Sequence, residues 1–450
     1  MRRFLVLMLI LTLLVGCAPM TVTPEGTEPS STSEEAQYVV AQISREQPKA
    51  DDIRAVPDLV HGINAFAADF YRALAADNQD NQVFSPYSIE RAFSLAYAGA
   101  REDTAAQMQE VLYFLPQETH HPAWGALGWY LAHMEGPGGE DALRLHVADS
   151  VWVQRDYPLR ETYVDILGRY YHVGLWKVDF IRARERARQA INRWVQQETE
   201  GKIQQLIPRG ALDEMTRLVL ANAIYFNGLW VHFFTSKEER PFTLIDGTPI
   251  TVTMMTQKEI FPYTEGEDYQ AVFLPYQLGA RVPNLLSDRK PPGVEMLILL
   301  PAAGHLEDVE QRLSPEFLAS LREQSEEYLV TLKLPPFKFR SGPPLTRLLQ
   351  DMGLNIPFDG KRANFLGISP RAEKVPLYIS DAFHQAIIDV NWRGTEAAAA
   401  TGIVMKEVSG VVSDLQATMI VDRPFIFAIV ERHTGVVLFM GRVMEPVREE

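Results

Sequence analysis

The amino-acid sequence predicts an α+β fold, because helical and strand patterns both occur and do not alternate regularly. The 450 residues are 46% hydrophobic and 22% charged, which is typical of a globular protein with a large core. Apolar residues recur at helical spacing over 59–76, whereas runs typical of buried strands occupy 218–226 and 294–300. A doubly wound parallel sheet would require strict alternation of strand and helix, which is absent.

The remaining elements are predicted from the same patterns. Two further helices are expected over 88–98 and 102–113, and a strand with alternating apolar side chains begins at Leu143. Segment 279–293 is rich in proline and charge and is predicted to be a surface loop. Later strands are predicted over 328–334, 383–390, 424–430 and 436–443, the last two joined as a hairpin.

Charge and cysteine content exclude several classes of protein. The formal net charge is −15 with scattered basic segments, which disfavours nucleic acid as a partner. Cys17 is the one cysteine, so no internal disulfide is possible. The nucleophile-elbow, zinc-protease and nucleotide-loop motifs are all missing. We therefore expect a monomer that is not an enzyme, with no catalytic residues, cofactor or metal.

The N-terminus is typical of a processed export signal. Residues 1–17 combine two arginines, an apolar stretch and Leu14-Val15-Gly16-Cys17, which resembles the lipobox of bacterial lipoproteins. That resemblance implies a lipid on Cys17, which becomes the new N-terminus. Ala18 stands where an aspartate commonly retains lipoproteins at an inner membrane, so an outer-membrane or cell-surface location is expected. The alternative is a plain secretory signal that contains a cysteine.

Residues 18–56 separate this signal from the folded domain, predicted over 57–450. They are rich in Ser, Thr, Pro and Glu and poor in aromatic residues, so they bury too little surface to offset their ordering entropy. We predict a flexible tether; the alternative is a structured N-terminal extension.

The segment from Gly394 to Met405 has an unusual pattern. Four alanines follow Glu396, although the flanking residues favour strand. Read at period two, the face that begins with Thr395 carries only small and then apolar side chains, without charge. The segment is compatible with a loop in one state and a half-buried strand in another. Taken alone, it is equally compatible with a short alanine-rich helix in a surface loop.

Five motifs in the right order extend a resemblance to the serpin family across residues 59–446. They are Asn81–Ile89, Thr199–Ile203, Ala221–Trp230, Asp422–Phe427 and Phe439–Val443. The resemblance implies a large mixed β-sheet, two smaller sheets, surrounding helices and an exposed reactive-centre loop at about 392–420.

The resemblance also implies a function, the irreversible suicide inhibition of serine proteases. A target protease would cleave the loop and form a covalent acyl-enzyme, and the cut loop would then insert into the main sheet. Trp230 matches the breach tryptophan at the top of that sheet. The matched hinge is Gly394, Thr395, Glu396, Ala397, Ala398, Ala399 and Ala400, and the matched shutter is Ser85, Ser88, Asn222 and His384. For His384 the plain alternative, a satisfied core histidine, gives nearly the same structural role.

Counting along the loop predicts the reactive bond. In the family the scissile carbonyl lies fourteen residues after the hinge glycine, which gives Val408–Ser409 and an elastase-like or subtilisin-like target. Lys406 would instead direct the inhibitor to trypsin-like proteases, Met405 is another contender, and counting back from Pro424 lands near Ser413.

Two features depart from the family pattern, and two rival functions remain. Trp392 and Arg393 stand where many inhibitory members carry acidic residues, and the loop is several residues longer than usual. The rivals are a non-inhibitory serpin acting as carrier or chaperone, and a solute-binding lipoprotein, which does not explain the hinge.

Overall fold

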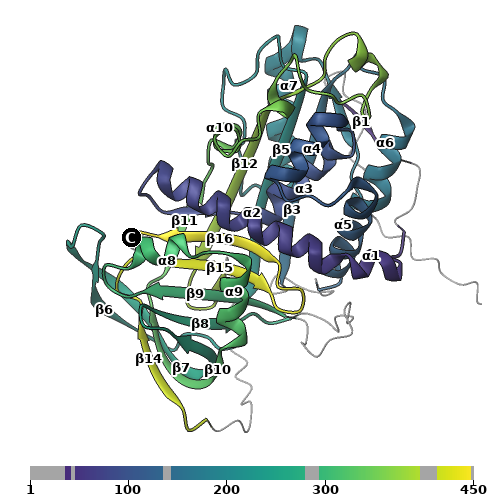
Figure 1. Ribbon diagram of the computed structural model, residues 1–450. Coiled ribbons are helices and arrows are strands. Elements are labelled where there is room, and N and C mark those ends of the chain that lie inside the picture. Colours follow the sequence, from purple (N-terminus) through teal and green to yellow (C-terminus); the bar gives the residue numbers. More distant parts are fainter. Residues whose placement is uncertain (1–35, 42–45, 135–142, 279–292, 396–412, 447–450) are drawn as a thin grey trace, which may run out of the picture.

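The computed structural model describes residues 36–41, 46–134, 143–278, 293–395 and 413–446. Helices and strands mix around two large sheets, which confirms the α+β class (Figure 1). The predicted loop at 279–293 lies almost entirely outside the described residues.

The main sheet has seven strands in the order β1-β4-β3-β5-β13-β12-β11. It is mixed, as expected, because β4 runs parallel to β3, and β5 parallel to β12, while the other pairs are antiparallel. Its strands are β1 (Ala36–Val39), β3 (Arg144–Gln154), β4 (Leu175–Val178), β5 (Leu218–Leu229), β11 (Phe337–Ser341), β12 (Ile379–Val390) and β13 (Gly394–Thr395).

The strands expected in two smaller sheets form one hydrogen-bonded path instead, β14-β10-β7-β8-β9-β15-β16-β2, with β6 paired to β7. The reason is the length of β7, 17 residues, whose first half pairs with β6 while its end pairs with β8. These strands are β2 (Gln82–Phe84), β6 (Ser236–Thr243), β7 (Pro249–Glu265), β8 (Tyr269–Pro275), β9 (Val294–Pro301), β10 (Glu326–Leu334), β14 (Gln416–Ile420), β15 (Phe425–Glu431) and β16 (Val437–Val443).

Helices surround the sheets, and the predicted ones are present with small shifts of their ends. Helix α3 begins two residues earlier than expected because Ser85 caps it, accepting a hydrogen bond from the Ser88 amide at 3.1 Å, with Pro86 at the first helical position. The helices are α1 (Ala50–Arg54), α2 (Val56–Asp77), α3 (Pro86–Tyr97), α4 (Glu102–Val111), α5 (Gln117–Ala132), α6 (Glu161–Ile166), α7 (Phe180–Glu198), α8 (Leu306–Gln311), α9 (Pro315–Glu323) and α10 (Leu345–Asp351), with short turns at Leu167–Tyr171, Ile356–Phe358 and Pro370–Glu373.

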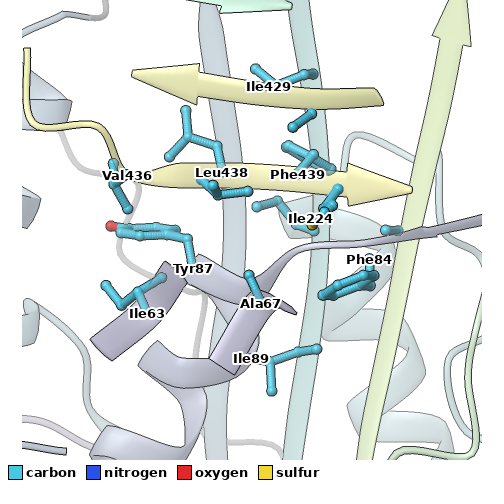
Figure 2. Packing of buried hydrophobic residues seen from close by; sticks show 14 of the residues in the cluster. Ile63, Ala67, Phe84, Tyr87, Ile89, Ile224, Ile429, Val436, Leu438 and Phe439 are labelled. Carbon is cyan, nitrogen blue, oxygen red and sulfur yellow. The ribbon is translucent and has the colours of Figure 1, made fainter. Parts of the chain in front are cut away.

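The largest core lies between α2, α3 and the strands of both sheets. Figure 2 shows Ile63 and Tyr87 from the helices beside the strand that carries Leu438 and Phe439, with Ile224 of the main sheet nearby. A second, smaller core lies under α7, where Ala187, Ile191 and Val195 pack on the main sheet with other residues of the cluster. The two faces of the main sheet are thus covered by different helices. Parting two strands of this sheet would therefore disturb the helices packed on it.

The tether prediction over 18–56 is wrong for its second half. Residues Ala36–Val39 form β1, which pairs antiparallel with β4, and residues 50–54 form α1. The Tyr38 ring packs on Trp176 with centroids 4.7 Å apart, and its hydroxyl accepts a hydrogen bond from the Gly174 amide at 2.9 Å. The average composition of 18–56 hid this short aromatic and β-branched segment, which finds its partners only in the folded sheet. Residues 18–35 lie outside the described residues.

Candidate functional site

The predicted hinge begins inside the main sheet. Gly394 and Thr395 form the two-residue strand β13, which lies between β5 and β12 and is antiparallel to both. Beyond this point β5 and β12 pair directly, from Ile379 beside Leu218 to Ile387 beside Tyr225. The sheet is therefore parted at one end only, by the first two hinge residues. Hinge residues Glu396–Ala400 and the predicted reactive bond Val408–Ser409 lie outside the described residues.

Glycine is required at the start of the hinge because two backbones approach closely there. A Cβ atom on Gly394 would meet the Gly228 carbonyl oxygen at 2.1 Å and the Leu229 Cα at 2.8 Å. Any side chain would force β5 away from β13. This close approach is a steric reason for glycine at position 394.

Thr395 is completely buried, and its hydroxyl lies 2.6 Å from the hydroxyl of Tyr276. Burial raises the pKa of Tyr276 well above its usual value, so the phenol stays neutral and can donate or accept this bond. Sequence reasoning missed Tyr276, whose only local signal is that it follows the apolar strand β8. It stacks on Trp230 with ring centroids 4.4 Å apart.

Trp230, the predicted breach tryptophan, contacts the chain on both sides of the turn between β12 and β13. The Trp230 indole N–H donates to the Asn391 carbonyl at 3.0 Å, and its amide donates to the Arg393 carbonyl at 2.9 Å. The Asn391 amide in turn donates to the Gly394 carbonyl at 2.9 Å, which closes a tight turn between β12 and β13. Trp230 therefore positions the turn from which the loop departs.

Trp392 and Arg393, the departures from the family pattern, sit in this turn. The Trp392 carbonyl accepts from the Phe234 amide at 3.0 Å, and its ring is 47% exposed. Arg393 is buried, and its guanidinium carbon lies 5.8 Å from the centroid of the Trp392 ring. The backbone carbonyls of both residues accept hydrogen bonds from the segment Trp230–Phe234, and this role in holding the turn does not depend on the charge of their side chains.

The four predicted shutter residues meet in the middle of the main sheet. The Ser85 amide donates to His384 Nε2 at 3.2 Å, so His384 carries its proton on Nδ1 and donates it to Asn222 Oδ1. Burial lowers the pKa of His384 to about 3, which keeps the ring neutral. Asn222 also donates to the Ser88 hydroxyl. Since Asn222 lies on β5 and His384 on β12, their bond crosses the line along which a strand would enter.

A buried ion pair extends this network, and the sequence analysis did not predict it. Asp149 on β3 pairs with Arg91 of α3 at 2.5 Å and accepts hydrogen bonds from Asn222 and Ser88. Burial raises the pKa of Asp149, while the Arg91 guanidinium acts in the opposite direction. The sequence signal is a lone acid in the middle of the largely apolar strand β3, at a position whose partner in β5 is Asn222.

The described residues contain neither a metal-binding cluster nor a membrane-spanning helix. No group of three or more His, Cys, Asp or Glu side chains in that part of the chain is arranged to hold a metal ion. None of its helices combines the length and the hydropathy needed to cross a membrane.

Comparisons with known proteins agree with the geometry. The family model described as serpin (serine protease inhibitor) matches residues 61–446. An uncharacterized serpin-like protein of Thermococcus kodakarensis is 35% identical over 99% of both chains. The leukocyte elastase inhibitor of Equus caballus is 35% identical over 85% of this chain and 97% of its own. The structure of Arabidopsis AtSerpin1, in its native stressed conformation, has a TM-score of 0.74 and 28% identity, and the match covers 87% of this chain and 98% of that one.

Proposed function

Because the chain belongs to the serpin family, we propose that it is an irreversible suicide inhibitor of serine proteases that acts by loop cleavage and insertion. Members of the family inhibit proteases and are generally not enzymes. The observation that carries the proposal is β13, because Gly394 and Thr395 already occupy the position where an inserting strand would begin.

The chemistry belongs to the protease. Its serine oxygen attacks the loop carbonyl, an ester bond forms to that carbonyl carbon, and the peptide bond breaks to release a new amino terminus that takes up a proton. The small hinge residues after Thr395 then follow it between β5 and β12, where alanines avoid overpacking. Insertion must outpace hydrolysis of the ester for the protease to stay trapped.

We expect the protein to form a complex with an elastase-like or subtilisin-like protease that survives detergent and heat. A protease whose catalytic serine is replaced by alanine serves as the control, because it can bind the loop but cannot form the ester. Denaturing electrophoresis after incubation with a panel of proteases provides the measurement. If every protease of the panel is released intact and active, the non-inhibitory alternative replaces the proposal.

The same complex identifies the reactive bond. Sequencing the released peptide should give a start at Ser409, which places Val408 in the primary pocket of the protease. Its medium aliphatic side chain suits a narrow apolar pocket, and the likeness to the leukocyte elastase inhibitor supports that class. A start at Glu407 would mean a trypsin-like target, and a start beyond Val412 would mean that the family's count does not apply here.

We also propose that the protein is exported and held at an outer membrane or cell surface by a lipid on Cys17. Two acyl chains bound to one cysteine are enough for stable anchoring. Replacing Cys17 by alanine should move the protein from the detergent phase to the aqueous phase or leave its signal uncleaved. Met20→Ala, three residues further on, should leave partition unchanged. Equal partition of Cys17→Ala and wild type would refute the anchor.

A further inference from the structure

Helix α7 gathers positive charge that the overall composition conceals. Its 19 residues include five arginines and two glutamates, in a chain whose net charge is −15. Arg188 binds Glu185 through two hydrogen bonds of 2.8 and 2.9 Å, which lower the pKa of Glu185 to about 2. Arg182, Arg184 and Arg186 near the start of the helix are exposed to solvent. The outer surface of α7 is therefore basic.

The exposed side of α7 carries polar residues along most of the helix and one apolar residue near its start. Arg186 and Arg193 share one side with two glutamines at spacings of three and four residues, opposite the buried Ile191 and Val195. Ile181, at the second position of the helix, is 40% exposed. Because the apolar face of α7 packs on the main sheet, any binding to a membrane would depend on charge, and clusters of basic residues do bind anionic lipid surfaces.

The N-terminal segment enters the folded body beside this basic end. In the antiparallel pairing of β1 with β4, Ala36 lies opposite Val178, two residues before α7 begins at Phe180. Figure 1 shows β1 and α7 at the same end of the molecule, away from β10 and β14. Ala36, at which the described chain begins, therefore lies near the arginine-rich start of α7.

A row of rings joins β1 to α7 and fixes their relative position. The Tyr38 ring contacts Trp176, Trp176 stacks on Trp152 at 5.1 Å with planes 10° apart, and Trp152 meets Trp194 of α7 at 6.0 Å. Aromatic pairs of this kind add to the apolar burial beneath the helix. These ring contacts connect β1, where the described chain begins, to α7 through β4 and β3.

We propose that the basic face of α7, defined by Ile181, Arg182, Arg184, Arg186 and Arg193, docks on anionic lipid headgroups of the membrane that holds the protein. Eighteen residues separate Cys17 from Ala36, a chain that spans at most about 65 Å when fully extended. A lipid on Cys17 would keep this face within reach of the bilayer, where clustered basic residues are attracted to anionic headgroups. The opposite end, with β10 and β14, would then face away from the membrane.

The docking face can be tested without the anchor, so the two proposals fail separately. The chain from Ala18 onward keeps every residue that the structure describes but lacks Cys17. We expect it to bind vesicles of phosphatidylcholine mixed with phosphatidylglycerol, and not vesicles of phosphatidylcholine alone. Because each basic residue near an anionic surface changes partition about fivefold, the variant R182Q/R184Q/R186Q should bind about a hundredfold more weakly.

The matched control is K237Q/K258Q/R312Q, which makes the same change of charge at exposed residues of β6, of β7 and of the end of α8, in the half of the molecule opposite α7 (Figure 1). It should bind as wild type does, and both variants should keep the wild-type melting temperature. Raising the ionic strength should abolish wild-type binding. Equal losses in the two variants would mean that net charge alone governs binding, and binding that ignores phosphatidylglycerol would exclude headgroup recognition; either result overturns the proposal.

Discussion

Cleavage of the reactive-centre loop should raise the melting temperature by roughly 20 °C or more. In the intact protein, β5 and β12 pair in parallel over most of their length, and only Gly394 and Thr395 lie between them. A complete insert of about 14 residues would replace that parallel ladder by two antiparallel ladders, which are more stable per residue. The intact form would then be a kinetically trapped state.

Calorimetry on the intact protein and on protein cut in the loop by a protease that it does not trap provides the measurement. The control is the intact protein incubated with inactivated protease, whose melting temperature should not move. If cut and intact proteins melt together, the loop does not insert, and the proposed mechanism of inhibition is excluded.

Replacing Thr395 by arginine should convert the inhibitor into a substrate. The wild-type side chain is fully buried and bonded to Tyr276, so a guanidinium there would be buried against the phenol and Trp230. We therefore expect the arginine to leave this position in the intact protein, and insertion would have to bury it again. That burial costs about 3 kcal/mol or more, enough to slow insertion about a hundredfold. The acyl-enzyme then hydrolyses before the protease is trapped. The number of inhibitor molecules consumed per protease should therefore rise steeply.

Two further variants separate charge from loss of the hydroxyl. Thr395→Ser keeps a partner for Tyr276 and should inhibit as wild type does. Thr395→Val has the same shape but leaves the phenol without this bond, so a small loss of stability of about 1 kcal/mol is expected with inhibition retained. Wild-type inhibition by Thr395→Arg would contradict our account of the hinge.

The sequence predicts those parts of the site that depend on local pattern or on family motifs. The hinge pattern predicts Gly394 and Thr395, and the family motifs predict the shutter positions. In the structure Ser85, Asn222 and His384 are in hydrogen-bond contact. Helix α3 shows why local prediction succeeds there, since its cap and first-turn proline are neighbours in sequence.

The parts that could not be predicted depend on partners distant in sequence. Tyr276 matters only because the fold places it between Trp230 and Thr395. In the sequence, Asp149 is an unexplained acid in an apolar strand. Its role becomes clear only from its register with Asn222 and its ion pair with Arg91. Strand β1 was missed because its stability comes from β4, about 140 residues away, and not from its own composition.

The position of β1 has a mechanical consequence. It is the outermost strand of the main sheet, only four residues long, with β4 and β3 between it and β5. A force applied through the residues before Ala36 would load the four-residue β1–β4 ladder first. That short ladder yields before load reaches β5 and β12, so pulling on the N-terminus peels away β1 and leaves the line along which the loop must enter undisturbed.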